Sequence, residues 1–206
     1  MTYDALMPII DEALLEPLAR YLRFITGIKY IDKSQPIALV DLGCGPKIRF
    51  FHFAKKHNVK IKKYLGVDPL VNKTIVNQFK QDKIISILNQ PLIKKIDIKD
   101  NSVDYVIAFA FFEHIDHPKE IMAESYRILK PNGKLILTVP SPQAKSFLEF
   151  MSYKLGIISS REIEEHQRYF DKKLLIEHLP KSINSSQIHH HYFEQGLNNL
   201  MVVTKK

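Results

Sequence analysis

The sequence contains a single cysteine, Cys44, and no apolar run near the roughly 20 residues that cross a bilayer. One cysteine cannot form an internal disulfide, which argues against a disulfide-stabilised secreted scaffold and favours a cytoplasmic protein. The lack of a long apolar run excludes a membrane-spanning helix. The first residues place acids such as Asp4 and Asp11 among apolar side chains. This pattern predicts an amphipathic helix over 6–25, not a signal peptide.

Arginine is also scarce, although the net charge is +8. Six of the thirty basic residues are arginine, the side chain best suited to bidentate contacts with phosphates and bases. The lysines occur in pairs scattered along the whole chain, so a solvated basic surface is favoured over a nucleic-acid footprint. Nucleic acid nevertheless stays open as an alternative partner.

Repeats, low-complexity tracts and glycine/serine linkers are absent, and the composition is that of an ordinary globular protein. A length of 206 residues fits one domain with a sizeable core. We therefore expect a single domain over 1–206. Its expected parts are an N-terminal helical cap (1–30), a ligand-binding core (37–140), a cap over a second ligand, the acceptor, together with the last helix (141–180), and a terminal hairpin (186–204).

Five short runs rich in β-branched residues alternate with helix-like segments. Such runs are typical of strands buried on both faces of a parallel sheet. Two further runs are separated by only Glu194-Gln195-Gly196, too few residues for a parallel crossover, so they predict an antiparallel hairpin. The predicted fold class is α/β, a doubly wound, mostly parallel seven-stranded sheet with a C-terminal antiparallel hairpin. The expected strands are 37–42, 64–67, 84–88, 103–110, 134–139, 187–193 and 197–204.

Two helices have clear boundary signals. Pro118 suits the first turn of a helix over 118–129, and the sequence Lys-Pro-Asn-Gly at 130–133 ends it. Asp171 is expected to cap a helix over 172–179.

The strongest local motif is ALVDLGCGPKI, residues 38–48. A buried strand ends at Asp41, Gly43 and Gly45 form a tight turn, and Pro46 is expected to open a helix. Glycines let the backbone approach a ligand closely, and a helix N-terminus offers free N–H groups to an anion. A dinucleotide fingerprint would need glycine or alanine where Ile48 stands, which argues against that class.

A second acid, Asp68, lies at the end of the next expected strand, 23 residues after Gly45. A carboxylate in this place can accept hydrogen bonds from both ribose hydroxyls of a nucleotide-like ligand. The apolar Pro69 and Leu70 follow directly and could line one face of an adenine ring.

The segment 101–140 closely resembles the type-11 family of class I S-adenosylmethionine-dependent methyltransferases, and the earlier motifs agree with that family. The matching residues of the segment are Asp104, Glu113, His114, Pro118, Glu124, Arg127, Leu129, Lys130, Pro131 and Gly133. The resemblance implies a Rossmann-like fold and S-adenosyl-L-methionine as the cofactor. Lys47 replaces the last glycine of the family's [DE]-x-G-x-G-x-G motif.

The same resemblance implies roles for single residues. The Gly43–Gly45 loop would pack against the methionine part of the cofactor, and Asp41 would hold the loop or the amino group. Asn89 would meet the adenine amino group, although Gln90 is placed equally well. Phe109 counts among the cofactor contacts, although Phe109, Phe111 and Phe112 more often indicate core than pocket.

Two histidines are candidates on the acceptor side. His114, just past the fourth expected strand, could act as a general base, and a histidine that holds the loop is the alternative. His166 lies in a segment that borders the acceptor cavity in related proteins, and a packing role is the alternative. Cys44 has no residue placed to activate it, and the run 189–191 of histidines is too short for a zinc site, so we predict no metal.

Together these patterns predict an enzyme that transfers a methyl group to a small-molecule acceptor. The alternatives are a catalytically silent, methyltransferase-like binding or scaffold domain and a nucleic-acid methyltransferase. A nucleotide-dependent oxidoreductase is disfavoured by Ile48 and by the terminal hairpin. The identity of the acceptor, the atom that is methylated and the oligomeric state stay open.

Overall fold

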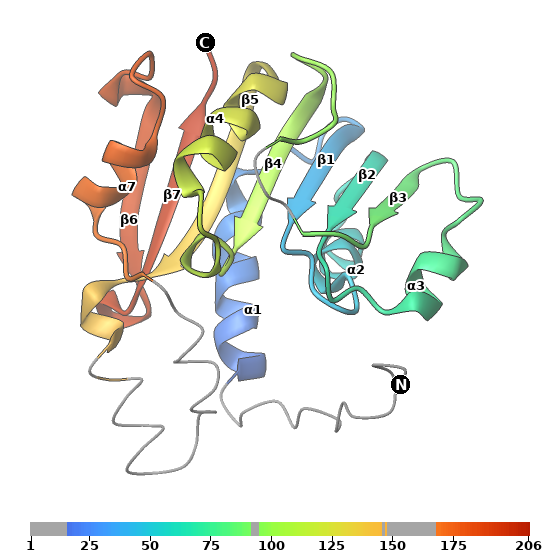
Figure 1. The fold of residues 1–206 in the computed structure, drawn as a ribbon, viewed down its shortest axis with the longest axis horizontal. Helices are drawn as coiled ribbons and strands as arrows, with labels where there is room; N and C mark the ends of the chain where they lie inside the picture. The colour runs from blue at the N-terminus through green and yellow to red at the C-terminus, as the bar shows by residue number, and fades with distance from the viewer. Residues whose placement is uncertain (1–15, 92–94, 146, 148–167) are drawn as a thin grey trace.

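A computed structural model describes residues 16–91, 95–145, 147 and 168–206. Its described part forms one seven-stranded sheet in the order β3-β2-β1-β4-β5-β7-β6 (Figure 1). The first five strands are parallel, β7 pairs antiparallel with β5, and β6 pairs antiparallel with β7. This confirms the predicted fold class. The strands are β1 (Ile37–Leu42), β2 (Ile61–Val67), β3 (Ile85–Leu88), β4 (Val103–Phe109), β5 (Leu129–Pro140), β6 (Ile188–Phe193) and β7 (Asn198–Thr204).

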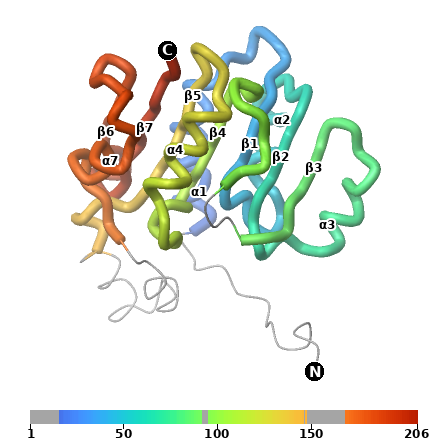
Figure 2. The backbone as a smooth tube through the Cα atoms, turned by 45° about the horizontal axis from the view of Figure 1, so that its top comes forward, coloured from blue at the N-terminus to red at the C-terminus, as the bar shows by residue number. Residues whose placement is uncertain are grey.

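Helices cover both faces of the sheet (Figure 1, Figure 2). One face packs against α4 (Pro118–Ile128) and α7 (Lys172–His178). The other face packs against α1 (Glu16–Gly27), α2 (Arg49–Lys56) and α3 (Lys73–Gln78). Because β1 lies between the two layers, all six of its residues are buried. That double burial explains the unbroken apolar pattern from which the strand was predicted.

Several boundaries differ from the sequence expectation. The strand expected at 64–67 already begins at Ile61, and the one expected at 134–139 spans Leu129–Pro140. The helix expected to open at Pro46 begins at Arg49, because Ile48 has a left-handed backbone with a φ of 44°. Asp171 caps α7 as predicted and accepts a hydrogen bond from the Leu174 N–H at 2.7 Å.

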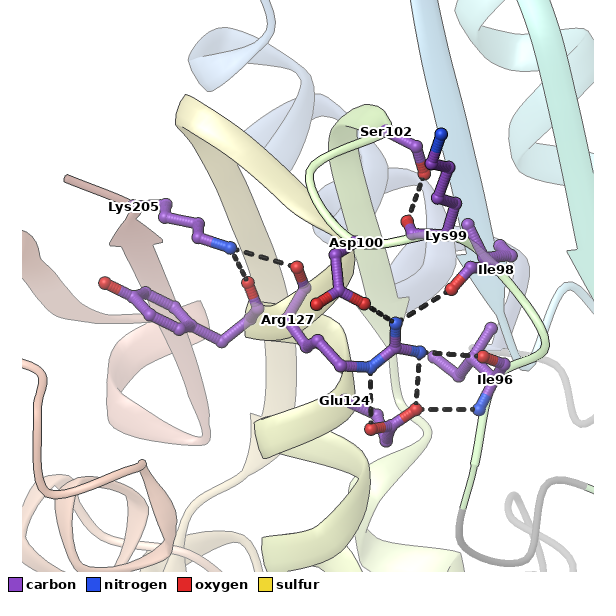
Figure 3. A network of polar contacts seen from close by, with 9 residues as sticks. Ile96, Ile98, Lys99, Asp100, Ser102, Glu124, Arg127 and Lys205 are labelled. Atoms are coloured by element: carbon purple, nitrogen blue, oxygen red, sulfur yellow. Dashed lines mark hydrogen bonds and ion pairs between the residues drawn. The ribbon is translucent and has the colours of Figure 1, made fainter.

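A polar network, here called the Arg127 brace, closes the amino end of β4 (Figure 3). The Arg127 guanidinium donates two hydrogen bonds to the Glu124 carboxylate, at 2.9 and 2.7 Å. It also donates to the carbonyls of Ile96 and Ile98, both at 2.9 Å, and to Asp100. The brace ties α4 to the chain that leads into β4. Glu124 and Arg127, two residues of the family pattern, are therefore structural.

Candidate functional site

A cavity of about 190 Å³ opens at the carboxyl ends of β1 and β4. The loop that follows β1 lines it with Gly43 and Gly45, and α1 and the start of α2 line its sides. The first turn of α1 lies at the same end of the sheet as the arrowheads of β1 and β4 (Figure 1). A larger hollow of about 460 Å³, which Lys119 and Pro180 help to line, contains none of the predicted site residues. The 190 Å³ cavity is therefore the candidate site, since ligands of open α/β sheets bind at this edge.

The glycine loop is shaped for close contact with a ligand. Gly43 and Gly45 both have a φ of 71°, a backbone conformation that favours glycine. A Cβ atom on Gly43 would lie 2.6 Å from the ring of Phe111, whereas a Cβ on Gly45 would meet nothing within 4 Å. Gly45 thus faces open space that a side chain would fill. This geometry fits the predicted role of the loop as a cradle for the cofactor.

Asp41 lies beneath this loop and is 2% exposed. Its carboxylate accepts a hydrogen bond from the Tyr64 hydroxyl on β2 at 2.7 Å. Burial raises the pKa of Asp41 to about 7, while the Tyr64 hydrogen bond lowers it and the nearby Asp68 raises it. Asp41 therefore changes its charge near neutral pH. Cys44 is also buried, and burial raises the pKa of its thiol, which disfavours a nucleophilic thiolate.

Asp68 joins the end of β2 to the glycine loop. One carboxylate oxygen accepts a hydrogen bond from the Gly45 N–H at 2.9 Å, and the other accepts one from the Leu70 N–H at 2.7 Å. Because each carboxylate oxygen has a second lone pair, Asp68 can still accept hydrogen bonds from a ligand. Pro69 and Leu70 are exposed.

Asn89, just past β3, is exposed. Its amide N–H donates to the Val71 carbonyl, so Asn89 is tied to the segment that follows Asp68. The amide oxygen is the remaining acceptor of this side chain.

An aromatic wall closes the inner side of the cavity. Phe109, at the end of β4, is 8% exposed and lines the cavity together with Phe24 and Phe50. Its ring centroid lies 5.6 Å from that of Phe24 and 5.0 Å from that of Phe50. Phe109 therefore belongs both to the cavity and to the core, which were the two alternatives for such aromatics.

Charged residues of α1 and α2 form a part of the site that the sequence predictions missed. Glu16, Arg20 and Arg23 line the cavity, and so does Arg49 at the start of α2. The Glu16 carboxylate lies 2.6 Å from Arg23 and 3.4 Å from Arg20. The sequence did contain a signal, since residues spaced by three and four share one face of a helix. Nothing in the sequence alone showed that this face of α1 meets the glycine loop.

Glu113 is the buried member of the Glu113-His114 pair, whereas His114 is exposed. Glu113 is 1% exposed, and its Oε2 atom has no hydrogen-bond partner among the residues that the structure describes. Burial raises the pKa of Glu113 to about 8, while the charge of Arg23 lowers it and that of Glu16 raises it. His166, the other predicted catalytic residue, lies outside the described residues.

The tip of the terminal hairpin reaches the same end of the sheet. Glu194 accepts a hydrogen bond from the Asn198 side chain, and burial raises its pKa. Its Oε1 atom is buried and unpartnered within the described part of the chain. Glu194 and Gln195 both have left-handed backbones, with φ values of 52° and 56°. Such strain concentrates at functional sites.

Among the described residues, no group of three or more His, Cys, Asp or Glu side chains is arranged to hold a metal ion. The rings of His189 and His191 lie 5.5 Å apart, and His190 contacts Asn199 through its Nε2 atom at 2.8 Å. Within the same ranges, none of the helices is both long and apolar enough to span a membrane.

Comparisons with known proteins agree with this geometry. The methyltransferase domain family matches residues 40–137. A mitochondrial ubiquinone biosynthesis O-methyltransferase of Dictyostelium discoideum is 24% identical over 130 residues, which cover 57% of this chain and 39% of that protein. The chain thus spans well under half the length of this relative.

Solved structures share the fold. A chain from the complex between the Haloferax volcanii Trm112 methyltransferase activator and a methyltransferase superposes with a TM-score of 0.66 at 15% identity, covering 91% of this chain and 92% of that one. An S-adenosylmethionine-dependent methyltransferase of Mesorhizobium loti gives a TM-score of 0.63 at 13% identity, over 91% and 98%. Together these findings show that residues 40–137 match the methyltransferase domain family and that the strand order is part of a fold shared with S-adenosylmethionine-dependent methyltransferases.

Proposed function

We propose that the chain transfers the methyl group of S-adenosylmethionine to a small-molecule acceptor. The observation that carries the proposal is the cradle, in which open space at Gly45 lies beside the Asp68 carboxylate, 2.9 Å from the Gly45 nitrogen. The sulfonium of the bound cofactor supplies an already activated methyl group. The protein then has to bind, orient and exclude water, which explains a site without a dense catalytic cluster.

Different residues would contact different parts of the cofactor. Gly43 and Gly45 would face the methionine part, and Asp68 would accept the ribose hydroxyls. Asn89 and Pro69 would border the adenine, and Phe109 would close the inner wall. For Gly43, Gly45 and Phe109 the assignments rest on their place in the lining of the cavity. Asp68, Pro69 and Asn89 lie outside that lining, and their assignments rest on their positions just past the carboxyl ends of β2 and β3.

Asp41 and the arginines of α1 suit the ends of the amino-acid part. A carboxylate of the cofactor would pair with Arg23, and Asp41 would attract its ammonium group. Both residues line the cavity. Charge-assisted hydrogen bonds of this kind are about twice as strong as neutral ones.

The acceptor would be bound by two carboxyl groups that are affected by the charges of Arg23 and Glu16. Glu113 and Glu194 each present an oxygen without a partner in the described part of the chain, and both sense the charges of Arg23 and Glu16. Hydrogen-bond donors of an acceptor would satisfy these oxygens, and Glu113 is suited to remove a proton. His114 stays a second candidate for that role at the exposed rim.

The positions of the arginines support a small molecule over a nucleic acid. Arg20, Arg23 and Arg49 line the cavity, Arg127 is held in the brace, and Arg168 donates to the carbonyls of Ile115 and Asp116. These arginines are thus not arranged as a surface for phosphates. The name of the Dictyostelium relative, which refers to ubiquinone biosynthesis, supports the same class of acceptor.

Calorimetry with S-adenosylmethionine, S-adenosylhomocysteine, NAD and NADP tests the cofactor. We expect the two adenosyl ligands to bind and the two dinucleotides not to bind. Asp68→Ala should weaken S-adenosylhomocysteine binding by about 1.5–3 kcal/mol, the effect of losing charge-assisted hydrogen bonds. Unchanged affinity in a folded variant would exclude Asp68 as a ribose ligand, and preference for a dinucleotide would refute the cofactor.

Radiolabelled methyl transfer tests the class of acceptor. Cell extract separated into a low-mass fraction and a fraction of nucleic acid and protein would be incubated with the enzyme and S-adenosyl-[methyl-³H]methionine. We expect label in the low-mass fraction. Label that enters the macromolecular fraction and is released by nuclease would support a nucleic-acid methyltransferase instead. Cofactor binding without label in either fraction would support the silent binding domain.

A further inference from the structure

The first turn of α1 carries a carboxylate into the positive part of the cavity. Glu16, Arg20 and Arg23 are spaced by four and three residues, so they share one face of the helix. One atom, the Glu16 Oε1, accepts hydrogen bonds from both guanidinium groups, at 3.4 Å from Arg20 and 2.6 Å from Arg23. All three residues line the same cavity as Gly43 and Gly45.

From this arrangement we infer that Glu16 is an internal competitor for the carboxylate of the ligand and sets how tightly carboxylate-bearing ligands bind. The inference rests on the proposed function, in which the cofactor carboxylate pairs with Arg23. A carboxylate of the ligand and the carboxylate of Glu16 are alternative partners for the same guanidinium edge. The ligand therefore has to displace the Glu16 side chain from Arg23.

The surrounding charges favour displacement over sharing. The charge of Arg23 already acts on two further carboxyl groups, since it lowers the pKa of both Glu113 and Glu194. Glu16 acts on the same two groups with the opposite sign. A ligand carboxylate would add a fourth acidic group to this cluster. Because burial raises the pKa of Glu113 to about 8, the repulsion that displaces Glu16 is chiefly that between its own carboxylate and the ligand carboxylate at the same guanidinium.

The ion pair is also sheltered enough to matter. The side chains of Arg23 and Arg20 are 12% and 19% exposed, and that of Glu16 is 29% exposed. Pairs of this kind are screened less than fully exposed ones. A ligand carboxylate has to open this pair before it can bind. The free energy needed for that should make the unmodified protein bind a carboxylate ligand several-fold more weakly than a protein without the Glu16 charge, a difference that a binding experiment can measure.

The test is Glu16→Gln, which keeps the shape of the side chain and removes its charge. Three ligands separate the groups of the cofactor. S-adenosylmethionine has both carboxylate and ammonium, decarboxylated S-adenosylmethionine keeps the ammonium, and 5′-methylthioadenosine has neither. We expect Glu16→Gln to bind S-adenosylmethionine about three- to tenfold more tightly, in line with the strength of partly exposed ion pairs. The other two ligands should change by less than about twofold, within the error of such affinities.

Two further variants control the experiment. Glu177→Gln removes an equally charged residue that pairs with Lys173 on α7, outside the cavity lining, and should change none of the three affinities. Arg23→Gln should weaken the binding of S-adenosylmethionine and leave the affinity for 5′-methylthioadenosine unchanged. In the double variant the gain from Glu16→Gln should shrink, because the contested guanidinium is gone.

The outcomes distinguish a failure of this inference from a failure of the proposed function on which it rests. Weaker binding of both cationic ligands to Glu16→Gln would mean that Glu16 attracts their ammonium or sulfonium group, which overturns the competition. Equal changes for all three ligands, or none, would overturn it as well. Failure of the unmodified protein to bind any adenosyl ligand would instead refute the proposed function, and the inference with it.

Discussion

The two ends of β4 each carry a polar cluster built around an arginine, and the clusters differ in how they are satisfied. In the Arg127 brace the guanidinium donates five hydrogen bonds, and pairing with Arg127 lowers the pKa of Glu124 (Figure 3). Around Arg23, burial raises the pKa of Glu113 and of Glu194, and both carboxyls keep an unpartnered oxygen in the described part of the chain.

The directions of these pKa shifts separate fold from function. A lowered carboxyl pKa means that the native state stabilises the charge, so the brace contributes to stability at neutral pH. A raised pKa means that burial opposes the charge, so Glu113 and Glu194 oppose folding where they are ionised. Groups that oppose folding in this way are expected where a ligand will satisfy them.

The largest expected effect comes from substituting one glycine at each end of β4, Gly43 near the site and Gly133 near the Arg127 brace. Gly43→Ala should weaken S-adenosylhomocysteine binding at least about 100-fold, because a Cβ would lie 2.6 Å from Phe111 on a backbone with a φ of 71°. Gly133→Ala is the matched control near the brace end, where a Cβ would lie 2.9 Å from the Lys130 carbonyl oxygen. It should lower stability and leave the affinity of the folded molecules unchanged.

Calorimetry gives the affinities, and urea unfolding gives the stabilities of both variants. If Gly43→Ala bound the ligand normally, the loop would not be the cofactor cradle. If Gly133→Ala weakened binding in folded protein, the two ends of β4 would be coupled, and the contrast between them would not hold.

The sequence predicted those parts of the molecule that local patterns encode. The mostly parallel sheet follows from the alternating apolar runs and its antiparallel hairpin from the three-residue connection, and the loop of Gly43 and Gly45 carries its own signature. The cluster around Arg23 could not be predicted, because α1, the turn after β4 and the hairpin tip lie far apart in sequence. The left-handed backbone of Ile48 was also missed, since a buried β-branched residue rarely adopts it. The roles of single site residues and the cytoplasmic location stay predictions.

A smaller effect is expected at the brace. Arg127→Met should lower the free energy of unfolding by about 2–3 kcal/mol, because Glu124 and two carbonyls lose their charged donor. The pKa of Glu124 is lowered in the folded state, so its contribution is present above its ordinary pKa and lost as the pH falls through the lowered value. The variant should therefore also lose part of the acid dependence of stability.

Urea unfolding at pH 7 and pH 4 measures both effects. Lys173→Met, which removes a cation that is 86% exposed, is the control and should change stability by less than about 0.5 kcal/mol. Ligand affinity should stay within about twofold in Arg127→Met. A stable Arg127→Met protein with impaired binding would make the brace part of the site, and the two ends of β4 would no longer differ in function.

The smallest effect is expected at Asp41, where stability and function should move in opposite directions. The pKa of Asp41 is about 7 in the folded protein, above its ordinary value of 3.8. Between these two values the folded state binds more protons than the unfolded state, so this group's contribution makes stability fall as the pH rises from about 4 to about 7. Asn at this position still accepts the Tyr64 hydrogen bond and carries no charge. Asp41→Asn should therefore be more stable than the unmodified protein at pH 8 and equally stable near pH 4.

The same change should weaken the binding of S-adenosylmethionine, because the ammonium group of the ligand loses its buried counter-charge. Denaturant unfolding at pH 4, 6 and 8 gives the stability difference between the two proteins, in which shared contributions such as that of Glu113 cancel. Tyr64→Phe is the matched control: it keeps the Asp41 charge but removes its hydrogen bond at 2.7 Å, so it should be less stable at pH 8. A stability difference that does not vary with pH would show that Asp41 titrates normally. If Asp41→Asn were stabilised and still bound the ligand with undiminished affinity, the buried charge of Asp41 would serve no ligand.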